Sequence, residues 1–204
     1  MENNTSISLY IGSTFTSEPI KLPIQWWCMQ FGVATSVTFL PYEQVLYSLI
    51  ESDMNANSVY ILLVRLVDWL RDTDYSDVIT CKKQLEFHYK SLLDFIRQSN
   101  KKDQLLVVFT PHEEIQKYNK ELTTFIASFY TRISHDIENI SYVRYLSLAS
   151  LTEVYAIDSW YDAHRDKAGH IPMGDNEKKQ VQKEFQRYGL SKDQWQVIAS
   201  CLYV

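Results

Sequence analysis

The chain lacks the features that mark secreted, membrane-spanning and nucleic-acid-binding proteins. Its three cysteines lie far apart and match no metal-ligand spacing, which is typical of a reducing cytoplasm. The longest apolar runs, such as residues 59–64, are far shorter than the ~20 residues that a membrane-spanning helix needs. Lys and Arg number 20 against 25 Asp and Glu, so a net charge of −5 leaves no basic footprint for nucleic acid. Residues 1–5 show no signal-peptide pattern. We therefore expect a cytoplasmic protein that binds neither nucleic acid nor membranes.

What the chain has in quantity is apolar and aromatic side chains. Of its 204 residues, 46% are hydrophobic, and they include fourteen tyrosines and five tryptophans. This length and composition are enough to bury one core, and no repeat, low-complexity run or flexible linker divides the sequence. We expect residues 1–204 to form a single domain.

Short β-branched runs alternate with longer amphipathic segments along the chain. The runs predict five strands, over residues 7–11, 34–40, 59–64, 104–110 and 142–148. The amphipathic segments predict a helix that Pro19 opens and Gly32 ends, and further helices over residues 42–50, 75–99, 113–137, 176–188 and 191–202. Such alternation predicts an α/β fold, a three-layer α/β/α sandwich with a mainly parallel five-stranded sheet.

In sheets of this kind, ligands bind at the carboxyl ends of the strands. Four loops qualify, over residues 12–18, 41–44, 65–71 and 110–114. The first contains Ser13, which could act as a nucleophile, although a hydroxyl that caps the following helix is the more common role. In the third, Arg65 could clamp an anion, or it could pair with Asp68 to fix the loop, with Trp69 packed beneath. The residues that these loops offer for substrate binding are Thr14, Thr16, Tyr42, Gln44, Arg65 and Asp68.

A loop-like segment after the last predicted strand concentrates acids and histidines. Its candidates for proton transfer are Asp158, Asp162, Asp166, His164 and His170. A histidine beside an aspartate can act as a general base, because the carboxylate orients the ring and stabilises its charged form. The apolar residues that follow His170 favour a partly enclosed ring, whereas His164 is expected in solvent. The spacings fit no common zinc or EF-hand pattern, so we expect no metal and no other cofactor.

Five stretches of the chain resemble the SGNH-hydrolase-like domain of FkbH-type proteins, which is also inserted in nonribosomal peptide and polyketide synthetases. They are Gly-Ser-Thr-Phe-Thr-Ser-Glu-Pro at 12–19, Phe-Leu-Pro-Tyr-Glu-Gln-Val at 39–45, Leu-Leu-Val-Arg-Leu-Val-Asp-Trp-Leu at 62–70, Thr-Pro at 110–111, and Tyr-Asp through Gly-His-Ile-Pro at 161–172. The resemblance spans residues 6 to about 173. The helices expected from about 174 to 204 would be an addition to it.

The resemblance implies a flavodoxin-like sandwich with a Ser–His–Asp site. Ser13 would be the nucleophile and His170 the general base, with Asp166 or Asp162 to orient it. The chain departs from the family pattern in three respects, one of which is Glu43 in place of the usual Asn of the Pro-Tyr-Asn-Gln segment. The oxyanion-hole Asn is missing from the 65–68 stretch, and the Asp166–His170 spacing is one residue longer than Asp-x-x-His. The Asp-x-Asp-x-Thr motif of the FkbH phosphatase domain is absent, so glyceryl transfer is not assigned.

Two functions follow. In the first, the chain acts on, or transfers, the acyl group of a carrier-bound intermediate. In the second, it is a catalytically silent module that docks an acyl or peptidyl carrier protein, or another synthetase domain. The missing oxyanion Asn favours the second.

Overall fold

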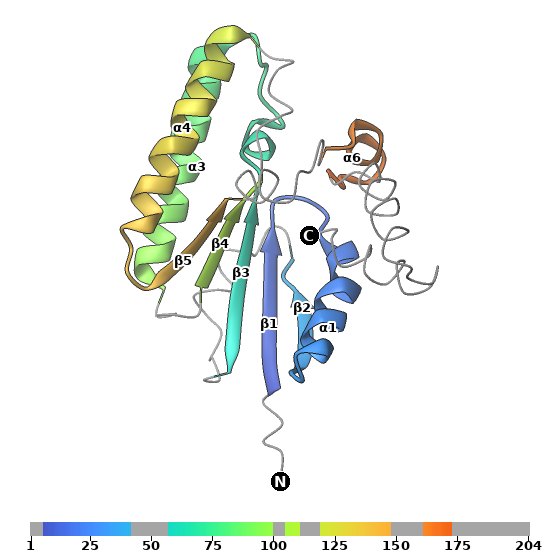
Figure 1. Ribbon diagram of the computed structural model, residues 1–204. Helices are drawn as coiled ribbons and strands as arrows, with labels where there is room; N and C mark the ends of the chain where they lie inside the picture. Colours follow the sequence, from blue (N-terminus) through green and yellow to red (C-terminus); the bar gives the residue numbers. More distant parts are fainter. Residues whose placement is uncertain (1–5, 42–56, 100–104, 111–118, 148–160, 173–204) are drawn as a thin grey trace, which may run out of the picture.

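The computed structural model describes a parallel sheet with helices on both faces (Figure 1). The described residues are 6–41, 57–99, 105–110, 119–147 and 161–172. The strands are β1 (Ser6–Ser13), β2 (Ala34–Phe39), β3 (Ser58–Val64), β4 (Leu105–Phe109) and β5 (Val143–Ser147), in the spatial order β2-β1-β3-β4-β5. The described helices are α1 (Lys21–Gln30), α3 (Val78–Gln98), α4 (Lys120–Glu138) and α6 (Ala163–Gly169), with 3-10 turns η1 (Glu18–Ile20) and η3 (Leu66–Leu70).

Two separate apolar cores show why the fold has three layers. Alternate residues of β3 and β4, such as Tyr60, Leu62 and Val107, face α3 and α4 and form the larger core. Their neighbours Leu63 and Val108 face the opposite side, toward η1 and α1. Because successive side chains of a strand point to opposite faces, strands apolar at nearly every position are buried on both. The three-layer α/β/α sandwich is therefore confirmed.

The helices over the larger core are amphipathic. The buried residues of α4 recur every three or four positions, at Leu122, Ile126, Phe129, Ile133 and Ile137. The same spacing buries one side of α3, whose first turn is capped by the side chain of Asp77 accepting from Thr80 N at 3.0 Å. Each helix thus packs one stripe on the sheet and leaves the other in solvent (Figure 1).

The strand order places a topological switch point between β1 and β3. The chain runs from β1 outward to β2, then returns across β1 to β3 and continues to β4 and β5. This is the flavodoxin-like order, in which neighbouring loops diverge at the switch point and leave a crevice at the carboxyl ends of the strands. The end of β1, near Ser13, and the residues after β3, near Arg65, border that crevice.

All five predicted strands are present, and all pairings are parallel. Gly32, at φ 69°, follows α1 as the predicted terminator. One expectation was wrong: residues 163–169 form the short helix α6 and not a loop, because the Asp162 side chain caps the segment. The helices expected over 42–50, 176–188 and 191–202 lie outside the described residues. No helix in the described ranges is long and apolar enough to cross a membrane.

Candidate functional site

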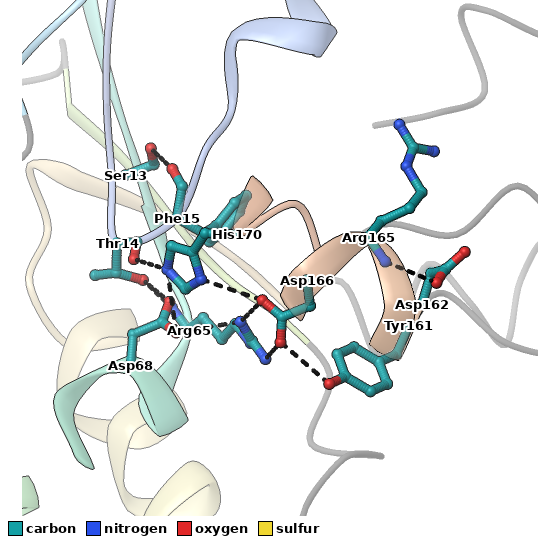
Figure 2. Close-up of polar contacts among 10 residues, drawn as sticks. All are labelled: Ser13, Thr14, Phe15, Arg65, Asp68, Tyr161, Asp162, Arg165, Asp166 and His170. Carbon is teal, nitrogen blue, oxygen red and sulfur yellow. Dashed lines mark hydrogen bonds and ion pairs between the residues drawn. The ribbon is translucent and has the colours of Figure 1, made fainter. Parts of the chain in front are cut away.

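A cluster of charged side chains lies at the switch point (Figure 2). Arg65 and Asp68 come from the turn after β3, and Asp166 and His170 come from α6, about a hundred residues later in the chain. Thr14 joins them from the residue after β1. Three segments distant in sequence therefore meet at the carboxyl edge of the sheet.

Arg65 is the centre of this cluster. The residue is only 4% exposed, and its Nη1 donates to Asp68 Oδ1 at 3.1 Å. It also grips Asp166 with both guanidinium nitrogens, Nη1 at 2.9 Å from Oδ1 and Nη2 at 2.7 Å from Oδ2. The Tyr161 ring lies 5.5 Å from the guanidinium carbon, and its hydroxyl donates to Asp166 Oδ2 at 3.1 Å. One buried cation thus joins η3 to α6 through charge-assisted hydrogen bonds.

His170 lies between two hydrogen-bond acceptors. Its Nδ1 is 3.1 Å from Asp166 Oδ1, and its Nε2 is 3.0 Å from the carbonyl oxygen of Thr14. Asp68 Oδ1 is 3.5 Å from the same Nε2. A carbonyl and an ionised carboxylate can only accept, so both contacts are satisfied when both ring nitrogens carry a proton. The ring is held there by backbone in the left-handed region, at φ 54°.

Thr14 closes the cluster on the β1 side. Its hydroxyl donates to Asp68 Oδ2 at 2.9 Å and accepts from the backbone N–H of Arg65, also at 2.9 Å. Two residues further on, the Thr16 N–H donates to the carbonyl of His170 at 2.9 Å. The loop after β1 is therefore bound to both η3 and the end of α6.

Ser13 is not part of this network. Its hydroxyl donates to the Phe15 carbonyl at 2.5 Å and lies 2.8 Å from Ser17 Oγ. Figure 2 shows the Ser13 side chain directed toward Phe15 and away from His170. The alternative role of these hydroxyls as a helix cap is wrong, because neither η1 nor α1 has a side-chain hydrogen bond at its N-cap. The loop instead uses its hydroxyls for contacts within itself and with Asp68.

Asp162 has a different neighbourhood from Asp166. Its carboxylate accepts from the backbone N–H groups of His164 and Arg165, at 2.9 and 3.1 Å, as an N-cap of α6. In Figure 2 it lies on the far side of α6 from His170. Of the two acids proposed to orient the histidine, Asp166 is the one in contact with it. Three further residues named from the sequence lie outside the described ranges: Tyr42, Gln44 and Asp158.

Burial and charge act differently on the two carboxylates of the cluster. Burial raises the pKa of Asp68 to about 6, against the opposing charges of Arg65 and His170 and a hydrogen bond from Thr14. Burial also acts to raise the pKa of Asp166, but the hydrogen bonds and charge of Arg65 outweigh it and lower that pKa. Asp68 is therefore the carboxylate of the cluster that takes up a proton first as the pH falls.

One side chain of the site, that of Tyr161, could not be predicted from the sequence. Tyr161 begins the 161–172 stretch, and the sequence predicts no role for it, although its ring contacts the Arg65 guanidinium and its hydroxyl donates to Asp166. Thr110 Oγ1, directly after β4, is buried and has no hydrogen-bond partner among the described residues. No group of three or more His, Cys, Asp and Glu side chains within the described ranges is arranged to hold a metal ion.

The fold and the cluster define an α/β sandwich with a polar site at its switch point. No protein-family model matches the sequence, and no curated protein is similar to it. Among solved structures, the fold is similar to the crystal structure of the N-terminal part of BF1531 from Bacteroides fragilis, described as containing a phosphatase domain complexed with Mg. The TM-score is 0.58 at 14% identity, over 83% of this chain and 48% of that one. The chain therefore spans about half of that structure, and the likeness concerns the fold alone.

Proposed function

We propose that this chain is a catalytically silent SGNH-like module of a nonribosomal peptide or polyketide pathway, which binds a carrier protein or another synthetase domain. The pathway and the partner class come from the resemblance of the five sequence stretches. The lack of catalysis is supported by the cluster. There Asp166 forms hydrogen bonds with both Arg65 and His170, and these bonds connect α6 to the sheet.

The central observation is the hydrogen bonding of His170. A general base must offer an unprotonated nitrogen to the hydroxyl that it activates. Here Nε2 faces the Thr14 carbonyl, an acceptor, and Nδ1 faces Asp166. The Ser13 hydroxyl is meanwhile engaged with Phe15 and Ser17. Neither member of the nucleophile–base pair is poised for attack, and the missing oxyanion Asn removes a further contribution of ~3 kcal/mol.

A serine-directed fluorophosphonate probe tests the silent site. We expect intact-mass measurement to show no adduct on Ser13 after prolonged incubation with excess probe, because an unactivated hydroxyl is a weak nucleophile. Ser13→Ala and His170→Asn are the matched variants. A wild-type adduct that maps to Ser13 and disappears in both variants would overturn this part of the proposal. Docking is followed separately, by titrating an isotope-labelled carrier protein with the chain, and unchanged spectra at high concentration count against it.

A second function, an acyl hydrolase or acyltransferase, is favoured by one contact. Asp166 orients His170 through Nδ1, as the acid of a triad does, and Nε2 lies against the residue next to Ser13. Rotation of the Ser13 side chain away from Phe15 would then complete a Ser13–His170–Asp166 triad acting on a carrier-bound acyl group. The same probe experiment decides between the two functions.

A further inference from the structure

A stripe of exposed apolar and basic residues runs along the outer face of α3. Ile79 is 68% exposed and Phe87 is 65% exposed, although both are large apolar side chains. Lys83 and Lys90, also exposed, lie at the intervening helical positions. Spacings of four, four and three residues keep all of them on one side of the helix, over about 16 Å.

A groove of about 500 Å³ lies beside this stripe, between α3 and α4. Its lining residues are Lys82, Lys83, Glu86, Phe87, Lys90 and Phe125. The Phe125 ring, from α4, is partly buried, and Lys82 Nζ lies 5.3 Å from its centre. The groove therefore has two aromatic rings, one on each helix, within a rim of lysines.

The charge of this rim is unbalanced. The acids near the groove already have partners, Glu121 with Lys82 Nζ at 2.8 Å and Glu86 with both guanidinium nitrogens of Arg132. Within the described part of the chain, Lys83 and Lys90 form no ion pair closer than 4 Å, although the charge of Lys83 helps to lower the pKa of Asp77 at the start of α3. The groove itself is lined by three lysines and one glutamate. A chain with a net charge of −5 thus carries a locally positive, partly apolar groove.

We infer that this groove docks an acidic amphipathic helix of a partner protein. An amphipathic helix enters such a groove with apolar residues at i, i+4 and i+7, a span of about 10 Å. Ile79 and Phe87 are eight positions apart on the exposed side of α3, a rise of about 12 Å, so a helix of that kind can contact both. Acids on the flanks of that helix would meet Lys83 and Lys90 and direct the encounter. Aromatic side chains at the centre of a contact carry most of its affinity. The inference concerns a surface outside the switch-point cluster, so it holds or fails independently of the proposed function.

The test uses a designed 18-residue helical peptide with leucines along one face and glutamates on its flanks, labelled with fluorescein. Anisotropy gives its affinity for the full chain, and amide spectra of the isotope-labelled chain locate the contact. We expect micromolar binding that weakens with salt, with shifts concentrated in residues 79–90 and 121–125. Lys83→Glu combined with Lys90→Glu, and separately Phe87→Ala, should each weaken binding at least tenfold.

Matched controls come from α1 and its C-cap, on the other side of the sheet. Lys21→Glu repeats one charge reversal, and Phe31→Ala removes a phenyl ring that is 75% exposed; each should change the affinity less than twofold. The inference is overturned if the peptide does not bind at millimolar concentration, or if the double lysine variant binds it as tightly as wild type. It is equally overturned if a leucine–lysine peptide binds as well, or if vesicles of anionic lipid compete for the same lysines and the shifts follow the lipid.

Discussion

At the scale of single residues, Arg65 is the side chain on which the stability of the cluster depends most. It is the buried cation that contacts both Asp68 and Asp166, which belong to different segments of the chain. Removing one member of a buried ion pair is costly, because the partner keeps its charge without compensation. The side chains of Tyr161 and His170 do not replace the bidentate contact that Asp166 would lose.

We predict that Arg65→Met lowers the free energy of unfolding by about 3–5 kcal/mol, measured by urea denaturation. Methionine keeps much of the side-chain length and removes the charge. Arg97→Met is the control, since Arg97 lies 3.8 Å from Asp94 in a pair whose side chains are 62% and 48% exposed, and it should cost less than about 1 kcal/mol. Equal losses for the two variants would show that the buried cluster contributes no more than a surface pair.

At the scale of elements, α6 depends on contacts from outside itself. It has seven residues, none of them buried, and a helix of that length is unstable in isolation. The Asp162 cap holds its N-terminus, and contacts of Asp166 with Arg65 and of His170 with the Thr14 carbonyl hold the rest to the sheet. The helix α3, by contrast, has 21 residues and packs eight of them in the core.

Asp162→Ala should therefore lower the free energy of unfolding and also loosen α6 itself. We expect a loss of about 1 kcal/mol in unfolding free energy and faster amide hydrogen exchange across residues 161–172. Asp77→Ala removes the equivalent cap from α3 and is the matched variant. Exchange within α3 should stay slow there, because core packing holds the helix. Unchanged exchange in 161–172 after Asp162→Ala would contradict the role of the cap.

At the scale of the whole molecule, the cluster makes folding stability depend on pH. A carboxyl whose pKa is raised by folding binds its proton more tightly in the folded state. The contribution of Asp68 is therefore full below its unfolded pKa, near 3.8, and is lost as the pH rises through about 6. The lowered pKa of Asp166 acts in the opposite direction, since its contribution is lost as the pH falls.

Comparing wild type with Asp68→Asn isolates the first effect, because Asp166 is common to both proteins. Asparagine resembles the protonated acid at every pH. We expect the stability of wild type, relative to Asp68→Asn, to fall by about 2 kcal/mol between pH 4.5 and pH 7.5 in urea denaturation. A difference that grows with pH would mean that Asp68 is stabilised as the anion, and that its pKa is lowered and not raised.

Most of the fold could be predicted from local pattern. The five strands are predicted to within two residues at each end. The central strands β3 and β4 are apolar at nearly every position because both of their faces are covered, whereas the edge strand β2 is marked by its Val, Thr and Phe content. The helix expected over residues 75–99 is present as α3, and it buries one stripe that includes Leu85, Tyr89 and Ile96. The α6 helix was missed because it has no apolar stripe to detect; a single cap and contacts with distant residues hold it.

The site could be predicted in part. The rule that ligands bind at strand ends selected Thr14, Arg65 and Asp68, which do lie together. Their contacts with α6 could not be predicted from the sequence, because the bonded residues are far apart in the chain. Arg65 and Asp166 are separated by 101 positions, and Thr14 and His170 by 156. Hydrogen-bond direction at that range depends on the packing of α6 and not on any neighbour in the sequence.

The sequence by itself determined which segments carry the polar groups of the site, because residue type and strand periodicity are local properties. These segments are the acid- and histidine-rich stretch, the hydroxyls after the first strand and the charged turn after the third. Only the folded arrangement decides which residue of the loop after β1 lies beside the histidine, and whether the ring faces acceptors or a nucleophile. There the buried guanidinium of Arg65 binds both carboxylates, and His170 lies between Asp166 and the Thr14 carbonyl. The physical reason is that a buried charge must be paired, and its pairing takes precedence over local preference.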